Sequence, residues 1–268
     1  MWRTARRLVR YRGLLAILTV RELKARYRGS VMGWLWSLVN PLVLLAVYTF
    51  VFGKIFHPHD ESISQPYALF LISGLFPWIW LQSSLLEGAA SLLTNAGLIR
   101  KATFPAEVLP MVPVLANLVH LALALPVIAA AVVVARHLGY DVGGPGALLM
   151  PLVVLLQLPL IAGLSLGLAA LNAHFKDVRD LLMNVLTVLF FMTPILYSIR
   201  MLDRHDAVRA LVAYNPLTPF ILAYQETLFF GRLPGPASWL AMAAISAGAW
   251  ALGTALFGRL SDTLVEAV

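Results

Sequence analysis

The stretch RELKARYRGSVMGWLWSLVNPLVLLAVYTFVF, residues 21–52, decides the fold of this 268-residue chain. It opens with four basic residues: Arg21, Lys24, Arg26 and Arg28. The apolar run that follows contains no charge until Lys54, which leaves room for a helix of about 20 residues, the length that crosses the hydrocarbon core of a bilayer. Because basic residues gather on the cytoplasmic side of membrane helices, we expect a first membrane span whose N-terminal side is cytoplasmic.

Composition indicates that the whole chain is a membrane protein. Hydrophobic residues make up 60% and charged residues 12% of the sequence, whereas soluble domains carry about 25% charged residues. The net charge of +7 does not indicate a nucleic-acid partner, because the basic residues concentrate beside the first span, where anionic lipid headgroups and membrane orientation explain them. The chain has no cysteine, which excludes disulfides and thiolate metal sites.

Charge-free windows predict an all-α polytopic protein with six membrane helices in one domain, residues 1–268. Residues 1–30 are expected to form a cytoplasmic interfacial region, since arginines in residues 1–12 recur at helical spacing opposite an apolar face; a disordered basic tail is the alternative. The membrane domain covers residues 31–257, and residues 258–268 form a cytoplasmic tail. After the first span, the windows lie at or within residues 67–86, 108–135, 147–171, 181–199 and 237–257.

The segment ALVAYNPLTPFILAYQ, residues 210–225, is apolar but is interrupted by Asn215, Pro216 and Pro219. It is too short and too broken to span a membrane. We expect a pair of short re-entrant helices before the last span, because broken backbone at membrane depth must be covered by protein or line a cavity. A surface loop with an apolar patch is the alternative.

Known catalytic and nucleotide-binding motifs are missing from the sequence, including the phosphate loop, the His-Glu-x-x-His zinc motif and the Gly-x-Ser-x-Gly motif. Ionisable residues near the spans are reduced to Glu87 and His120, so a chain of buried carboxylates that could carry ions is not expected. His57, His59 and Asp60 lie in a loop with an intervening proline, which favours solvated side chains over a metal site. The sequence therefore predicts no catalytic residue, no metal site and no cofactor bound to this chain.

Aromatic residues concentrate on the first two spans. Candidate channel-lining residues are Trp34, Tyr48, Phe52 and Trp78, because sugar rings stack well on aromatic planes; anchoring at the lipid headgroups is the alternative. Gly163 and Gly167 in the fourth span have the spacing of a close helix–helix contact.

Five segments along the chain carry a family resemblance: RYRGSVMGWLWSLVNPL, ISGLFPWIW, NAGLIRKATFPAEVLP, HFKDVRD and YNPLTPF. They resemble the polysaccharide-exporting permeases of the type-2 ABC transporters, most of all the O-antigen export permeases, with teichoic-acid and capsule permeases as near relatives. The resemblance implies a homodimer in the bacterial inner membrane, with both termini cytoplasmic. It also implies two copies of a separate ABC ATPase subunit, which binds ATP and Mg, and a channel for a lipid-linked polysaccharide. A membrane-embedded enzyme or scaffold acting on lipid-linked glycan is the alternative function.

By the same resemblance, two inner loops are expected to contact the ATPase. The first supplies a coupling helix, with these contact residues: Asn95, Leu98, Ile99, Arg100, Lys101, Phe104 and Glu107. The second is a weaker contact formed by His174, Lys176, Asp177 and Arg179. A solvated loop held only by lipid is the alternative for the first of them.

Two further sites complete the expectations. Arg26 and Arg28, just before the first span, are expected to bind the pyrophosphate of the substrate where it enters, because a guanidinium contacts phosphate oxygens in a two-pronged way. The alternative is that they only set topology and bind anionic lipid. An outer gate is expected near the two-fold axis of the dimer, with docking of an outer partner as its alternative; it consists of Tyr214, Asn215, Pro216, Pro219, Phe220 and Tyr224.

Overall fold

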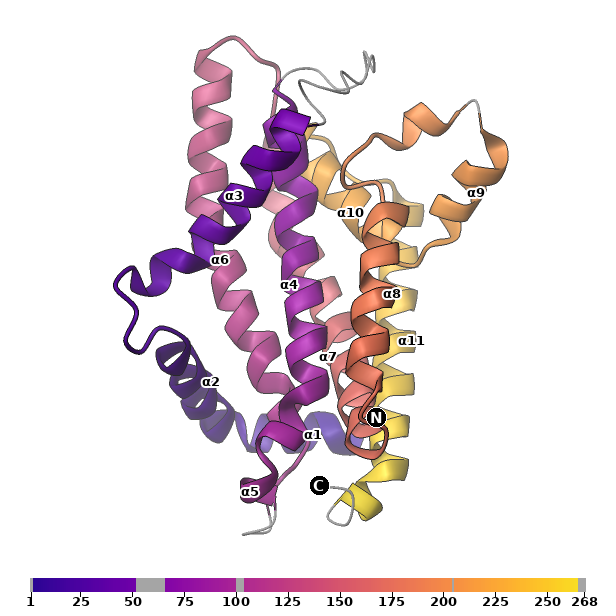
Figure 1. Ribbon diagram of the computed structural model, residues 1–268. Helices are drawn as coiled ribbons and strands as arrows, with labels where there is room; N and C mark the ends of the chain where they lie inside the picture. Colours follow the sequence, from indigo (N-terminus) through magenta and orange to yellow (C-terminus); the bar gives the residue numbers. More distant parts are fainter. Residues whose placement is uncertain (1, 52–65, 100–103, 204, 265–268) are drawn as a thin grey trace.

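The computed structural model describes residues 2–51, 66–99, 104–203 and 205–264, and this part of the chain is helical without strands (Figure 1). Five of its helical segments are long and apolar enough to cross a membrane. They contain α3 (Trp36–Phe50), α4 (Tyr67–Thr94), α6 (Val108–His137), α7 (Met150–His174) and α11 (Pro236–Leu260). The short turn η1 (Gly33–Leu35) extends α3, and η3 (Pro145–Leu149) extends α7. The predicted all-α membrane class is thus confirmed.

The sixth predicted span, residues 181–199, coincides with a shorter helix. Helix α8 (Val178–Met192) has 15 residues, about 22 Å of helix, against a hydrocarbon core of about 30 Å. It ends there because Pro194 follows, and the residue before a proline is disfavoured in the α conformation. Thr193 accordingly has extended backbone, with φ −100° and ψ 138°. The count of six spans therefore remains a prediction.

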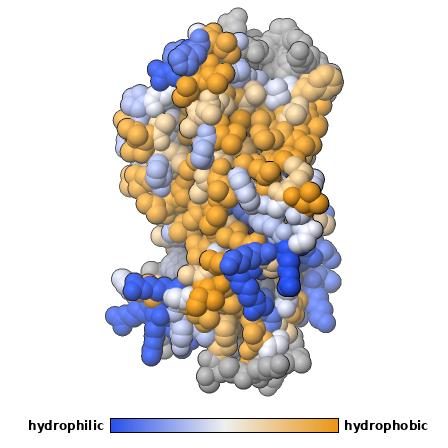
Figure 2. Space-filling model, turned by 90° about the vertical axis from the view of Figure 1, so that its left-hand side faces the viewer, coloured by the Kyte–Doolittle hydropathy of each residue, from blue (hydrophilic) through white to orange (hydrophobic). Residues whose placement is uncertain are grey.

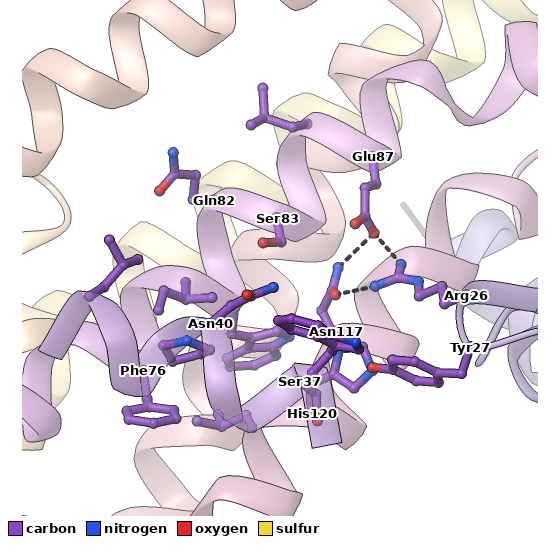
Figure 3. Close-up of a pocket in the computed structure, with 17 residues that line it drawn as sticks. Arg26, Tyr27, Ser37, Asn40, Phe76, Gln82, Ser83, Glu87, Asn117 and His120 are labelled. Atoms are coloured by element: carbon purple, nitrogen blue, oxygen red, sulfur yellow. Dashed lines mark hydrogen bonds and ion pairs between the residues drawn. The ribbon is translucent and has the colours of Figure 1, made fainter. Parts of the chain in front are cut away.

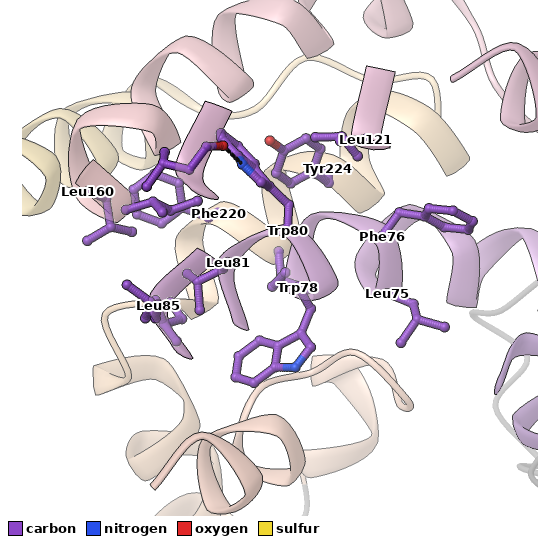
Figure 4. Close-up of a cluster of buried hydrophobic side chains, with 14 of the residues drawn as sticks. Leu75, Phe76, Trp78, Trp80, Leu81, Leu85, Leu121, Leu160, Phe220 and Tyr224 are labelled. Carbon is purple, nitrogen blue, oxygen red and sulfur yellow. Dashed lines mark hydrogen bonds between the residues drawn. The ribbon is translucent and has the colours of Figure 1, made fainter. Parts of the chain in front are cut away.

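Helix α4 forms the centre of the bundle. Most of its residues are apolar, as expected of a helix surrounded by others, and it packs against α3, α6, α7 and α8. Trp78 and Trp80 on α4 are almost completely buried, together with Phe220 from the far end of the molecule (Figure 4). The indole of Trp80 donates a hydrogen bond to the Val114 carbonyl at 3.2 Å, which ties α4 to α6.

Helices α7 and α11 touch backbone to backbone. A Cβ atom on Gly163 would lie 2.5 Å from the Ala249 carbonyl oxygen, and one on Gly167 would lie 3.3 Å from the Gly253 Cα. A Cβ atom on Gly253 would overlap the carbonyl of Gly163. The predicted contact at Gly163 and Gly167 is therefore confirmed, because only glycine permits this approach.

The N-terminal helices α1 (Trp2–Arg10) and α2 (Arg12–Arg26) lie across one end of the bundle, near α5 (Ala96–Ile99) and the end of α11 (Figure 1). We call this the basic end. Figure 2 shows a hydrophilic zone low on the molecule and a broad apolar band above it. The helix predicted for residues 1–12 is thus present, and the side chains of α1 divide into an arginine-rich face and an apolar face.

The opposite end, which we call the far end, includes these short helices besides η3: η4 (Ile199–Leu202), α9 (Asp206–Tyr214), α10 (Thr218–Tyr224) and the π-helix η5 (Gln225–Phe229). The chain between α9 and α10 breaks at Asn215, whose backbone is extended. The predicted pair of short helices is present there. Whether they enter a membrane stays a prediction.

Candidate functional site

A cavity of about 430 Å³ opens near the basic end, between α3, α4, α6 and the end of α2 (Figure 3). One wall is polar and contains Arg26, Glu87 and Asn117. The rest of the lining is mixed, with the apolar side chains of Trp36, Leu44 and Phe76 beside polar ones such as Asn40 and Gln82. A cavity lined by both kinds of side chain suits a ligand that has an apolar part and a polar or charged head.

The polar wall is organised by Arg26, whose three guanidinium nitrogens are all engaged. Nη2 pairs with the Glu87 carboxylate, Nη1 donates to Asn117 Oδ1 at 2.9 Å, and Nε donates to Glu22 Oε1 at 3.3 Å. The Asn117 amide closes a triangle by donating to Glu87 Oε2 at 2.9 Å. Arg26 thus joins α2 to α4 and α6 in one network.

A second polar pair extends the same wall. The Tyr27 hydroxyl and His120 Nε2 are 2.8 Å apart, and their rings meet edge to face at 5.9 Å. His120 of α6 therefore contacts the end of α2. Sequence reasoning named neither Tyr27 nor Asn117. An amide in an otherwise apolar span was the available signal, because a buried amide needs a partner.

The two arginines predicted to bind pyrophosphate are separated. Arg26 faces the cavity, where two carboxylates already compensate its charge. Arg28 is exposed and lies with Arg21 and Lys24 beside a surface depression of about 450 Å³ along α2. We call these three residues the α2 basic patch. Its cations form no ion pair within the described residues, so the patch has more capacity for an anion than Arg26 has.

The first inner loop lies at the basic end, but its residues differ in exposure. Asn95, Leu98 and Phe104 are half-buried, and Ile99 is buried. Glu107 is also buried and pairs with Arg7 of α1 at 3.1 Å, so its carboxylate is already used within the chain. Arg100 and Lys101 lie outside the described residues, as does Phe52 among the channel residues and the loop with His57, His59 and Asp60.

The second inner loop lies at the same end and is more open. Its charged residues Lys176, Asp177 and Arg179 are exposed, while His174 is held by Thr263 at 2.8 Å. Asn172 anchors this loop. Its amide donates to the Ala89 carbonyl of α4 at 3.0 Å, and its side-chain oxygen accepts from the Arg179 backbone at 3.1 Å. Asn172 was not predicted as a functional residue.

The proposed channel-lining residues that the structure describes differ in exposure. Trp34 is exposed and Trp78 is buried. Tyr48 is half-buried, and the rings of Tyr48 and Trp78 both contact Phe190 of α8, at 5.8 and 5.6 Å. These two aromatics therefore join α3, α4 and α8.

The outer-gate residues also divide by exposure. Tyr214 is 87% exposed, and Pro216 beside it is exposed. Asn215 is buried, with its amide donating to Thr193 Oγ1 at 2.9 Å and its oxygen accepting from the Leu217 backbone at 3.0 Å. The rings of Phe220 and Tyr224 face the protein core rather than a surface (Figure 4), and Pro219 is half-buried at the start of α10.

The Tyr224 hydroxyl explains part of this burial, because it donates to Gln157 Oε1 of α7 at 2.7 Å. Of the predicted gate residues, Tyr214 and Pro216 are consequently the exposed ones. No group of three or more His, Asp or Glu side chains in the described part of the chain has the arrangement of a metal site.

Comparison with known proteins gives consistent matches. Residues 13–229 match the family described as ABC-2 type transporter. The O-antigen export system permease protein RfbA of Myxococcus xanthus is 34% identical over 271 residues, which cover 100% of both chains. The protein of the same name from Klebsiella pneumoniae is 33% identical over 82% of each chain. The polysialic acid transport protein KpsM of Escherichia coli is 21% identical over 92% of this chain and 93% of its own.

Proposed function

The chain belongs to the ABC-2 type transporter permeases, and from this we propose that it is the membrane subunit of an ATP-driven exporter of a lipid-linked polysaccharide, with O-antigen as the substrate class. Two copies would form the channel. The observation that carries the proposal is the match to an O-antigen export permease over the whole length of both chains. The cavity lined by both polar and apolar side chains supports it, because a lipid-linked glycan has both kinds of surface.

The energy for transport comes, in this proposal, from a separate ABC ATPase in two copies, which binds ATP and Mg. The sequence contains no phosphate loop of its own. Both inner loops lie at the basic end, which we assign to the cytoplasm of a bacterial cell, with the protein in the inner membrane and both termini inside. The exposed residues of the second loop and the anchoring of that loop by Asn172 to α4 would transmit movement of the ATPase to the centre of the bundle.

The proposal is tested by complementation. A cell lacking its own O-antigen export permease and ATPase is given this chain together with a candidate ABC ATPase from the same organism, and surface polysaccharide is measured. Restored surface O-antigen and co-purification of the ATPase are expected. Accumulation of lipid-linked glycan on the inner side despite normal membrane insertion would contradict the proposal. Restoration of a capsular polysaccharide alone would favour the second candidate, for which the likeness to polysialic acid transport proteins is the supporting observation.

Substrate is proposed to enter beside the α2 basic patch. Arg28→Lys retains the charge but loses the planar fork that binds two phosphate oxygens. We expect normal insertion and export reduced about tenfold, the value of roughly one charge-assisted hydrogen bond. The control is Arg10→Lys on the exposed side of α1. Equal export by both variants would mean that Arg28 serves topology and lipid binding only.

The far end is proposed to close the channel through paired short helices near the two-fold axis. The proposal rests on Tyr214, because its large aromatic side chain is 87% exposed. Tyr214→Cys, in a chain without natural cysteine, is expected to cross-link between copies at rest and to lose this cross-link when substrate is trapped. Phe220→Cys, at a buried position, is the control and should stay unlinked. Cross-linking of Tyr214→Cys that is unaffected by substrate would reject the gate.

A further inference from the structure

A second, smaller pocket lies at the far end, between the beginning of α4, η4 and the pair α10 and η5. Its volume is about 130 Å³. Its lining includes two arginines, a carboxylate, an amide and two aromatic rings, which belong to Arg200, Arg232, Glu226, Gln225, Phe70 and Phe230. None belongs to the gate, the channel lining or the loops already discussed.

Glu226 gives this pocket its polar character. It stands on the π-helix η5, a kind of helix that is rare and often found at functional sites. Its Oε2 atom is shielded from solvent and has no hydrogen-bond partner in the described chain. Burial raises the pKa of Glu226, while the Arg232 guanidinium opposes that shift. Because a shielded carboxylate oxygen without a donor is costly, a ligand that supplies a donor would be stabilised here.

The rim of the pocket carries cationic hydrogen-bond donors. Arg200 and Arg232 are exposed, and neither guanidinium forms a hydrogen bond or ion pair with any described residue. The Arg232 guanidinium lies 5.8 Å from the centroid of the Phe230 ring. Gln225 is different, because its amide already donates to the Pro194 carbonyl at 2.6 Å. The groups available to a ligand are thus one carboxylate acceptor, two sets of guanidinium donors and an aromatic ring.

This combination selects among ligand classes. A metal cation would be repelled by the two arginines, and an anion drawn to them would have no donor for the shielded oxygen of Glu226. A neutral polyhydroxyl compound avoids both penalties, since its hydroxyl groups donate to a carboxylate and accept from a guanidinium. The C–H face of such a ring also packs on an aromatic plane, here that of Phe230.

We propose that the pocket around Glu226, Arg200 and Arg232 binds one neutral sugar unit of the polysaccharide on the outer side of the membrane. This inference rests on the proposed function. A pocket of this size would hold one residue of a long glycan, so each contact would be weak. Weak binding suits a transport path, because a moving chain must be able to leave each site.

The test is titration of the purified full chain in nanodiscs with neutral mono- and disaccharides, including hexoses, deoxyhexoses and N-acetylhexosamines, followed by saturation-transfer NMR. At least one sugar should bind. Glu226→Gln and Arg232→Gln should each weaken binding about tenfold, as expected for one charge-assisted hydrogen bond. Arg200→Gln, at the exposed rim, provides a third variant in case Glu226→Gln does not fold.

Matched controls come from the same end of the molecule. Asp203 and Arg209 form a surface ion pair at 2.9 Å and do not line the pocket. Asp203→Asn and Arg209→Gln should leave sugar binding unchanged. Binding of sulfate or calcium in place of any sugar, or sugar binding that is insensitive to the three pocket variants, would overturn the inference.

The complementation assay separates this inference from the proposed function. If the unaltered chain exports polysaccharide but binds no sugar, the inference about the pocket is wrong and the proposed function as a permease still holds. Loss of export in the unaltered chain would contradict the function itself, whatever the titration shows.

Discussion

Gly253→Ala is expected to destabilise the protein by about 3 kcal/mol or more, at or above the upper end of the usual cost of overpacking. The new Cβ atom would overlap the carbonyl group of Gly163, which belongs to the backbone of α7 and cannot rotate away. Helices α7 and α11 must then move apart along their whole contact, which includes Gly167. The measurement is the midpoint of thermal unfolding in detergent, together with the yield of folded protein.

Gly248→Ala on the same helix is the control. A Cβ atom at Gly248 has no atom within 4 Å, and alanine is favoured over glycine in a helix by about 1 kcal/mol. This variant should therefore be as stable as the native chain or more stable. Equal stability of the two variants would show that α7 and α11 do not touch at Gly163 and Gly253 in solution.

The lengths of the uncharged hydrophobic stretches predicted most of the long helices. Four of the five candidate spans coincide with windows that charge alone marks out, and the first begins at Gly33, after the basic segment. The window at residues 181–199 was different, because mean hydropathy does not register the backbone restriction imposed by Pro194. The expected span there is a 15-residue helix followed by extended backbone at Thr193.

Side-chain partners were less accessible to sequence reasoning. Arg26 was selected for its position before a span, but its contacts with Glu87 and Asn117 join residues 61 and 91 positions apart. Spacing along one helix carries no information about such pairs. A lone amide in an apolar span is informative, since it must form a hydrogen bond when it is buried. Asn117, Asn172 and Gln157 each form such a bond.

Orientation about a helix axis explains why two of the predicted gate residues, Phe220 and Tyr224, are buried. Phe220 and Tyr224 flank a proline-broken segment, which favours exposure when only the sequence is considered. They stand at the four-residue spacing that places side chains on the same helix face. In the structure this face of α10 packs on α4 and α7, so both rings are buried and Tyr214, on α9, is exposed. The pair therefore serves to hold α10 against the bundle in this conformation.

The double variant Arg100→Glu, Lys101→Glu is expected to reduce export more than about tenfold while leaving ATP hydrolysis by the assembled complex measurable. The two residues lie outside the described part of the chain, and the prediction rests on their place in the first inner loop, between Ile99 and Phe104. In the proposed interface the two cations face carboxylates of the ATPase. Their reversal would bring like charges together at a cost of several kcal/mol, which is enough to uncouple the two subunits. Both export and ATPase activity must be measured in the same membranes.

Two further variants show whether position, rather than charge alone, decides this outcome. Arg259→Glu reverses an exposed cation at the end of α11, at the basic end but outside both inner loops, and should leave export unchanged. Lys176→Glu reverses an exposed cation in the second loop and should give an intermediate loss. The expected loss of export is thus largest for the variant in the first loop, smaller for Lys176→Glu in the second loop and absent for Arg259→Glu. An equal loss in all three would indicate a general effect of charge on membrane insertion, and unchanged export in the double variant would remove the first loop from the coupling path.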